Sequence, residues 1–226
     1  MDGVMGLSAG PASAYANMAA IARFSPSGYI DARNGAAYQA VAQIPYTAGL
    51  SYHFRMQISI PNHTYNVFVT PAGGSEQLVG ANFAFRSEQS SVTSLDNFAV
   101  YAKTGSHQVC NIAISPAPNL ANLSGTWTGT LSQGGTFSFF VSTSYIAQDG
   151  FIQLGGNPSC PGNNYDTGMA TIIGNTFIDY FQGGSYHVTV IGTFNSSSSA
   201  SGRYRVVDNT PGSSCSVDLT WTTTKP

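Results

Sequence analysis

The feature that most constrains this chain is an alternation of apolar and polar residues with a period of two. Its clearest case is the segment 52–60, YHFRMQISI, in which every second side chain is apolar. Successive side chains of a β-strand point to opposite faces, so the pattern predicts a strand with one buried face. Pro61, Asn62 and His63 then turn the chain into a second expected strand, 64–70. The two segments are expected to form an antiparallel hairpin.

Segments of the same kind recur along the whole chain, whereas helical periodicity is nearly absent. In the first half we expect a short helix at 91–97 and strands at 18–24, 28–33, 98–103 and 109–115. In the second half we expect an exposed hairpin loop at 195–199 and strands at 124–131, 136–142, 150–154, 169–173, 176–181, 186–194, 200–207 and 216–223. Short strands between regular turn signals predict an all-β chain built of sandwiches or barrels.

Two prolines, Pro116 and Pro118, mark the boundary between the halves. They favour an extended backbone and cannot donate hydrogen bonds to a sheet. We therefore predict a linker at 116–119 between a first module, 1–115, and a second module, 120–226. The chain has 226 residues, 42% of them hydrophobic, which is enough for each module to have its own core.

The surface is expected to be neutral and rich in hydroxyl groups. Charged residues make up only 8% of the chain and the formal net charge is −2, so no basic stripe is available to bind nucleic acid or anionic membranes. No apolar stretch is long enough for a membrane helix, and no signal peptide opens the chain. We expect a piece of a larger protein that is secreted, with the leader outside this sequence.

Three cysteines, Cys110, Cys160 and Cys215, give an odd count. We predict a disulfide between Cys160 and Cys215, which in the chain-entropy picture stabilises the second module by roughly 4 kcal/mol. Two buried thiols are the alternative. Cys110 lies in the expected strand 109–115 and is predicted to be a reduced core residue. A disulfide would place the protein in an oxidising compartment.

Two stretches of the first half, 21–35 (IARFSPSGYIDARNG) and 52–74 (YHFRMQISIPNHTYNVFVTPAGG), resemble a known family. They are similar to the laminin-G and concanavalin-type jelly-roll sandwiches appended to secreted bacterial polysaccharide-degrading enzymes. The resemblance covers most of residues 1–115 and implies a concave sheet that binds a glycan chain. Such modules begin with a strand before the position of Asp2 and Gly3, which this chain lacks, so we expect an edge strand to be missing. The second half resembles small secreted β-modules only in general.

The resemblance also implies that loops hold calcium in some members. Calcium needs six to eight oxygen ligands. The carboxylates here are scattered singly along the sequence. We predict no cofactor and leave a structural calcium open. The four histidines are far apart in sequence, and no metal site is predicted from them.

Polar residues that alternate with the apolar ones are candidates for a sugar site. If the strands that carry them lie in one sheet, their side chains converge on one surface. Planar polar groups bind sugar hydroxyls, and aromatic rings stack on sugar rings. The candidate carbohydrate-binding residues are Arg23, Tyr29, Asp31, Arg33, Tyr38, Tyr46, His53, Arg55, Gln57 and Tyr101. The alternative is that they form the polar surface that any exposed sheet face has.

Catalysis is the second class of function. Arg86-Ser87-Glu88 faintly resembles a strand motif of alginate lyases, and His53 with Gln57 would supply further parts of a lyase for uronate-containing polymers. A glycosidase needs two paired carboxylates, but the chain has only two glutamates and no pair of acids on one strand. Signatures of serine hydrolases, zinc proteases and nucleotide-binding loops are absent. No catalytic residue is assigned.

In the second module the two tryptophans, Trp127 and Trp221, share strand faces with residues two positions away. We predict core positions for both and keep a sugar platform as the alternative for Trp127. The polar loop 155–166 is a candidate binding loop or a surface loop fixed by the disulfide. Taken together, the sequence predicts a non-catalytic polysaccharide-binding pair of modules from a secreted bacterial protein. A polysaccharide lyase and a structural or adhesive spacer are the alternatives.

Overall fold

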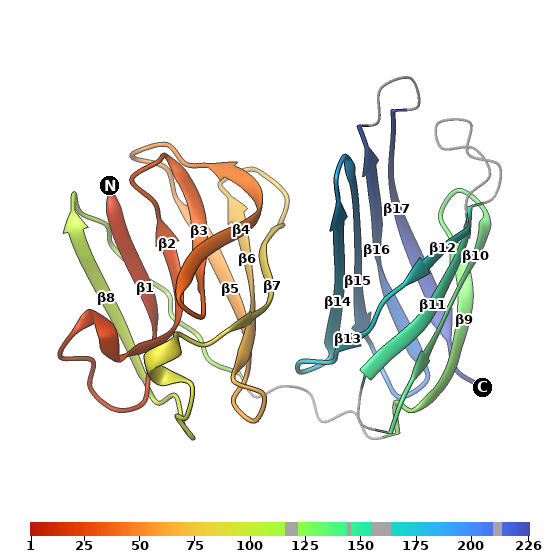
Figure 1. Cartoon of the computed structure of the whole chain (residues 1–226), viewed down its shortest axis with the longest axis horizontal. Helices are drawn as coiled ribbons and strands as arrows, with labels where there is room; N and C mark the ends of the chain where they lie inside the picture. The colour runs from red at the N-terminus through yellow and green to blue at the C-terminus, as the bar shows by residue number, and fades with distance from the viewer. Residues whose placement is uncertain (116–121, 144–145, 155–163, 210–213) are drawn as a thin grey trace. The chain divides into compact units, whose positions relative to one another are not determined.

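A computed structural model describes residues 1–115, 122–143, 146–154, 164–209 and 214–226. The chain divides into two compact units, 1–116 and 117–226, and each is described by itself. In the described residues all sheets are antiparallel and no α-helix occurs (Figure 1). The prediction of an all-β chain is confirmed. The expected linker 116–119 lies outside the described residues.

The first unit is a sandwich of a five-stranded and a three-stranded sheet. The five-stranded sheet has the order β4-β3-β2-β1-β8 and the three-stranded sheet the order β5-β6-β7. Two single-turn 3₁₀ helices, η1 and η2, span Tyr15–Asn17 and Ser87–Gln89. The strands are β1 (Asp2–Ser8), β2 (Met18–Phe24), β3 (Tyr29–Asn34), β4 (Ala37–Pro45), β5 (Tyr52–Ser59), β6 (Thr64–Pro71), β7 (Gln77–Ala84) and β8 (Asn97–Thr104).

The core of this unit lies between its two sheets. Ala22 and Phe24 of β2 and Ile30 of β3 meet Val67 and Val69 of β6 in one buried cluster. The apolar face of β5 packs against the same cluster through Tyr52, Phe54, Met56 and Ile58. A shift of one residue would exchange the faces of β5, so this packing turns its polar residues outward. The predicted orientation of β5 and its hairpin with β6 are confirmed.

Three expectations for the first half are wrong. Residues 109–115 form no strand, and Cys110 is exposed and free rather than part of the core. Residues 91–97 form no helix; the helical turn lies earlier, at η2. No strand was predicted at 2–8, where β1 lies between β2 and β8, and the expectation of a missing strand before Asp2 stays a prediction. Since β1 is buried on both faces from Gly3 to Gly6, it shows no alternation in the sequence.

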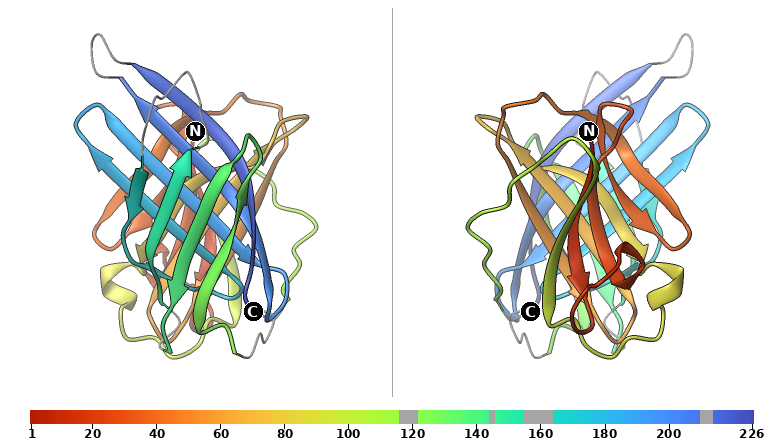
Figure 2. Two further views of the ribbon diagram at one scale, coloured as in Figure 1. Left: turned by 90° about the vertical axis from the view of Figure 1, so that its right-hand side faces the viewer. Right: turned by 90° about the vertical axis from the view of Figure 1, so that its left-hand side faces the viewer.

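The second unit is one coiled nine-stranded sheet. Its order is β12-β11-β10-β9-β17-β16-β15-β14, with β13 also paired to β11. Strands β9 to β12 pair in chain order, as do β14 to β17, and the pairing of β17 with β9 joins these two runs. Figure 2 shows the sheet coiling into a nearly closed barrel. The strands are β9 (Gly125–Leu131), β10 (Gly135–Val141), β11 (Ile146–Leu154), β12 (Asn164–Thr167), β13 (Ala170–Thr171), β14 (Thr176–Gly183), β15 (Tyr186–Phe194), β16 (Ser199–Asp208) and β17 (Cys215–Thr224).

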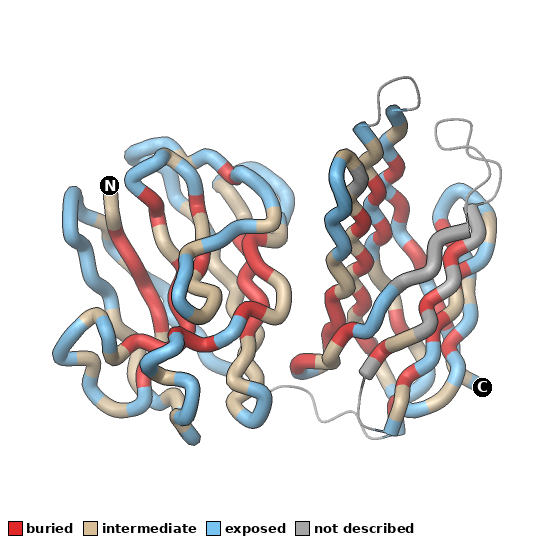
Figure 3. Tube along the Cα trace, viewed as in Figure 1, coloured by how far each residue is buried: buried red, intermediate tan, exposed pale blue. Residues whose placement is uncertain are grey.

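Aromatic side chains fill the interior of the second unit. Trp127 and Trp221 are 0% and 1% exposed, which confirms core positions for both. The Trp221 ring lies over Gly202, and the Phe177 ring lies over Gly192. Glycine is required where these rings meet the backbone, because an added Cβ would lie within 2.4 Å of ring atoms. Buried and exposed residues alternate along these strands (Figure 3).

The hairpin loop expected at 195–199 is confirmed, since the Asn195 amide donates to the Ser199 carbonyl at 2.8 Å between β15 and β16. Cys160 lies outside the described residues, as does most of the polar loop 155–166. The disulfide with Cys215 therefore stays a prediction.

Candidate functional site

The predicted sugar-binding residues do not converge on one surface. β5, which carries His53, Arg55 and Gln57, belongs to the three-stranded sheet, whereas β2, β3, β4 and β8 belong to the five-stranded sheet. The two sheets share the core through their inner faces, so their polar residues point away from each other. All of the candidates except Tyr46 thus fall into two groups on opposite outer faces of the sandwich.

Tyr46 belongs to neither group. Its ring packs edge-on against Phe24, with ring centroids 5.1 Å apart, and its hydroxyl donates to the Ser25 carbonyl at 2.8 Å. These contacts hold the segment after β4 against the core. Tyr29 lies on the outer face of β3 opposite Pro45 and is 37% exposed.

The larger group lies on the outer face of the five-stranded sheet. Sheet register places Tyr101 beside Val4, Val4 beside Arg23, and Arg23 beside Asp31. The same face continues to Arg33 and Tyr38, which are directly opposite each other on β3 and β4. Tyr15 of η1 covers part of this face. We call Tyr15, Arg23, Asp31, Arg33, Tyr38 and Tyr101 the tyrosine–arginine face.

Arg23 is held rigidly in this face. Its guanidinium donates to both Asp31 carboxylate oxygens, at 2.8 and 2.6 Å, and lies 3.7 Å from the Asp2 carboxylate. It also stacks on the Tyr38 ring, with 3.5 Å between the guanidinium carbon and the ring centroid. Burial lowers the pKa of Arg23, but the Asp31 hydrogen bonds and charge outweigh it and the pKa is raised. Arg23 therefore stays charged and fixed.

Tyr15 and Tyr38 are joined through their hydroxyl groups, which are hydrogen-bonded to each other. Burial, and next the bond to Tyr15, raise the pKa of Tyr38 well above its usual range. Tyr38 therefore stays protonated and is not poised as a general base. Arg86 lies over the other ring, 4.4 Å from the Tyr15 centroid, and donates to both oxygens of Glu88 at 3.0 and 3.1 Å.

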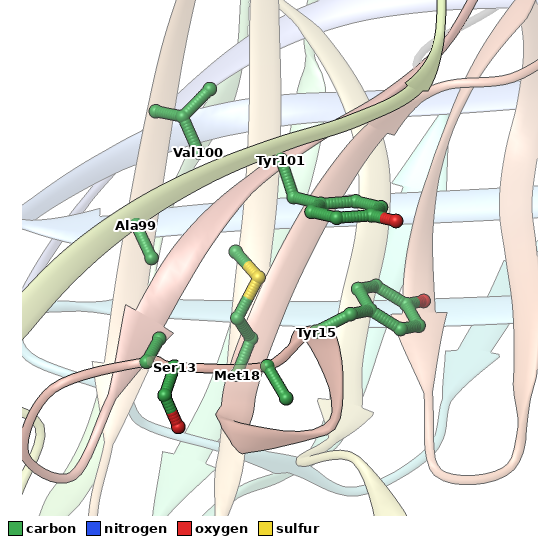
Figure 4. A pocket seen from close by; sticks show the side chains of 8 residues that line it. Ser13, Tyr15, Met18, Ala99, Val100 and Tyr101 are labelled. Carbon is green, nitrogen blue, oxygen red and sulfur yellow. The ribbon is translucent and has the colours of Figure 1, made fainter.

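A shallow pocket opens beside Tyr15. Tyr15 and Tyr101 line it, and Figure 4 shows their rings one above the other with the hydroxyl groups pointing the same way. The ring centroids are 6.0 Å apart and the rings are tilted by 34°. Tyr101 is 50% exposed, so part of its ring is open to solvent. The remaining lining residues are Ala12, Ser13, Ala14, Met18, Ala99 and Val100.

Sequence reasoning missed Tyr15 and placed Arg86 only in a lyase motif. Tyr15 follows a stretch of small residues that shows no alternation, and η1 brings its ring over a sheet formed by distant segments. The sequence holds no local signal for such a contact.

The smaller group lies on the outer face of β5. Arg55 donates to both oxygens of Glu76, at 2.9 and 2.6 Å, and its guanidinium carbon lies 3.9 Å from the centroid of the Phe68 ring. Gln57 accepts a hydrogen bond from Asn66 at 3.3 Å, and His53 is exposed. The arginine of this face is thus already engaged by a carboxylate of the protein.

The lyase constellation is not assembled. Arg86 and Glu88 pair beside Tyr15, while His53 and Gln57 lie on β5 in the other sheet. Nor does the described part of the chain hold a group of three or more His, Cys, Asp or Glu side chains that could bind a metal ion. No helix in that part is long and apolar enough to span a membrane.

No model of a known protein family matches the chain, so the resemblance to laminin-G and concanavalin-type modules stays a prediction. A solved protein of unknown function from Nostoc punctiforme, of the DUF3598 family, is 11% identical and covers 83% of this chain and 92% of that one. Its TM-score of 0.30 is too low to support an argument.

A curated relative is similar over part of its length. A gellan lyase of a Bacillus species is 28% identical to this chain over 124 residues, which are 54% of the chain and 5% of the relative. The chain thus spans a small part of that protein. The findings support a chain with an all-β fold and a local similarity to a gellan lyase.

Proposed function

We propose that this chain is a non-catalytic piece of a larger secreted protein and that its first unit binds a polysaccharide on the tyrosine–arginine face. The observation that carries the proposal is the exposed Tyr101 ring beside the Tyr15 pocket, on the same sheet face as the fixed Arg23–Asp31 pair. Binding sites of this kind combine aromatic surface with a few oriented polar groups.

The arrangement is suited to binding because its parts are already ordered. Arg23 is held by Asp31 and by the Tyr38 ring, and Tyr38 is held by Tyr15. A ligand would meet side chains that lose little conformational freedom, which lowers the entropy cost of association. Tyr101 offers an amphipathic ring with few rotatable bonds.

The similarity to a gellan lyase supports a polysaccharide as the class of ligand. Because the similar region is 5% of that protein, the chain is suited to a role as one module among several. We propose that the protein is secreted, because it must meet an extracellular polysaccharide.

Binding is favoured over catalysis because Asp31, the carboxylate of the tyrosine–arginine face, is paired with Arg23 and because Tyr38 stays protonated. The pKa of Tyr38 is raised, chiefly by burial. The histidines of the first unit lie elsewhere: His53 is on β5, His63 packs on Phe85 and His107 packs on Phe24.

The test is a binding assay with the whole chain. Affinity electrophoresis against gellan, alginate, polygalacturonate, xylan and β-glucan is expected to retard the protein in at least one gel. Tyr101→Ala is expected to weaken that binding about tenfold. Arg55→Ala, on the opposite face, is the control and is expected to leave it unchanged. Absence of binding to every polymer, or equal losses in both variants, would contradict the proposal.

A lyase activity is the second candidate, favoured by the name of the relative. It predicts a rise in ultraviolet absorbance from unsaturated product when the chain is incubated with gellan. No product at high protein concentration would exclude it.

A further inference from the structure

Arg33 differs from the other arginines of the first unit. Each of the other three forms a paired hydrogen bond to a carboxylate, and these pairs are Arg23–Asp31, Arg55–Glu76 and Arg86–Glu88. Arg33 uses its Nε–H to donate to the Gly35 carbonyl at 2.9 Å. Within the part of the chain that the structure describes, no carboxylate forms an ion pair with it.

The position of Arg33 makes this difference relevant to binding. Its guanidinium carbon lies 5.3 Å from the centroid of the Tyr38 ring, on the outer face of β3, and the residue is partly exposed. The positive charge of Arg33 also acts on Glu88 of η2. The pKa of Glu88 is lowered, first by the hydrogen bonds from Arg86 and to a lesser degree by the charge of Arg33. The Nη groups of Arg33 carry donor hydrogens that fit a carboxylate in paired geometry.

A continuous series of contacts connects Arg33 with the exposed aromatic ring. Tyr101 lies beside Tyr15, Tyr15 is bonded to Tyr38, and Tyr38 lies beside Arg33. Because β8 and β3 are three inter-strand spacings apart, the series crosses roughly 14 Å of sheet. That is the length of a short oligosaccharide lying across the strands.

From this geometry we infer that the ligand is an acidic polysaccharide, with a sugar carboxylate bound to Arg33 and a sugar ring of the same chain stacked on Tyr101. The inference rests on the proposed function and specifies its ligand. A carboxylate from the ligand gives Arg33 the partner that Asp31, Glu76 and Glu88 give the other three arginines. A neutral polysaccharide offers the Nη groups of Arg33 no carboxylate.

The test compares each acidic polymer that the whole chain binds with its carboxyl-reduced form, which has the same backbone without the charge. The parent chain is expected to bind the acidic form about five- to twentyfold more tightly. Arg33→Gln is expected to remove that difference while keeping the weaker binding of the reduced polymer. Arg33→Lys is expected to keep part of it, since a lysine retains the charge but not the paired geometry.

Arg205→Gln is the matched control, because Arg205 is an exposed arginine of β16 for which no ion pair occurs among the described residues. It is expected to behave like the parent chain. Far-ultraviolet circular dichroism and melting temperature check that each variant is folded.

The outcomes separate the two proposals. Equal binding of acidic and reduced polymers by the parent chain overturns the acidic ligand and leaves the polysaccharide site intact. Preference for the acidic form that survives in Arg33→Gln overturns the role of Arg33. Failure to bind any polymer overturns the proposed function and this inference together.

Discussion

A single added methyl group at Gly202 is expected to destabilise the second unit selectively. A Cβ at this position would lie 1.9 Å from the Ile191 carbonyl oxygen and 2.4 Å from the Trp221 ring. The ring is itself fully buried among Phe137, Phe139 and Phe177 and has little room to move. Since such overpacking typically costs 1–3 kcal/mol, we expect Gly202→Ala to lower the free energy of unfolding by about that amount.

Tryptophan fluorescence during urea unfolding measures this effect in the second unit alone. The chain has two tryptophans, Trp127 and Trp221, and both lie in the core of that unit. With an m-value of about 1–3 kcal/mol/M, the urea midpoint is expected to fall by roughly 1 M. Gly168→Ala is the control, because its Cβ would meet Asp179 at an ordinary 3.6 Å. An unchanged midpoint in Gly202→Ala, or an equal fall in both variants, would refute the packing argument.

Three further predictions concern single groups. The pKa of Asp96 is lowered in the folded protein, chiefly by the hydrogen bond from the Gly10 amide. The ionised Asp96 carboxylate therefore stabilises the fold above the pKa of the unfolded chain, and this stabilisation is lost as the pH falls through the pKa of the folded protein. Asp96→Asn should therefore lower the melting temperature at pH 7 and have no effect in acid below that pKa; a loss of equal size in acid would contradict this. The buried Tyr65 hydroxyl donates to the Ile21 carbonyl at 3.0 Å. Tyr65→Phe should therefore lower the free energy of unfolding of the first unit by about 1–3 kcal/mol, measured by denaturant unfolding. An unchanged free energy of unfolding would count against this hydrogen bond. Thiol titration of the unfolded, unreduced chain should find one free thiol, that of Cys110, whereas three would rule out the predicted disulfide.

The alternation of apolar and polar residues was enough to predict the fold class and most strands. β2 and β15 have the bounds expected from the sequence, and the outward orientation of Arg55 followed from its apolar neighbours. This succeeds because the two faces of a strand are read locally, from residues two positions apart. Strands buried on both faces, such as β1, lack that signal.

The make-up of the candidate site was decided by the tertiary structure. Which strands share a sheet depends on pairings between distant segments, and those pairings placed β5 on one side of the sandwich and β2, β3, β4 and β8 on the other. The contacts of Tyr15 with Tyr38 and Tyr101 join residues 23 or more positions apart in the chain.

The sequence by itself determined that this protein is an all-β chain with few charged residues and with Arg55 on an outward-facing strand face. Only the tertiary structure decided which of the charged residues meet, and that Arg33 alone among the four arginines of the described first unit has no carboxylate partner. The physical reason is that burial of a strand face depends on near neighbours in the chain, whereas an ion pair depends on the positions of two side chains that only the completed fold brings within reach.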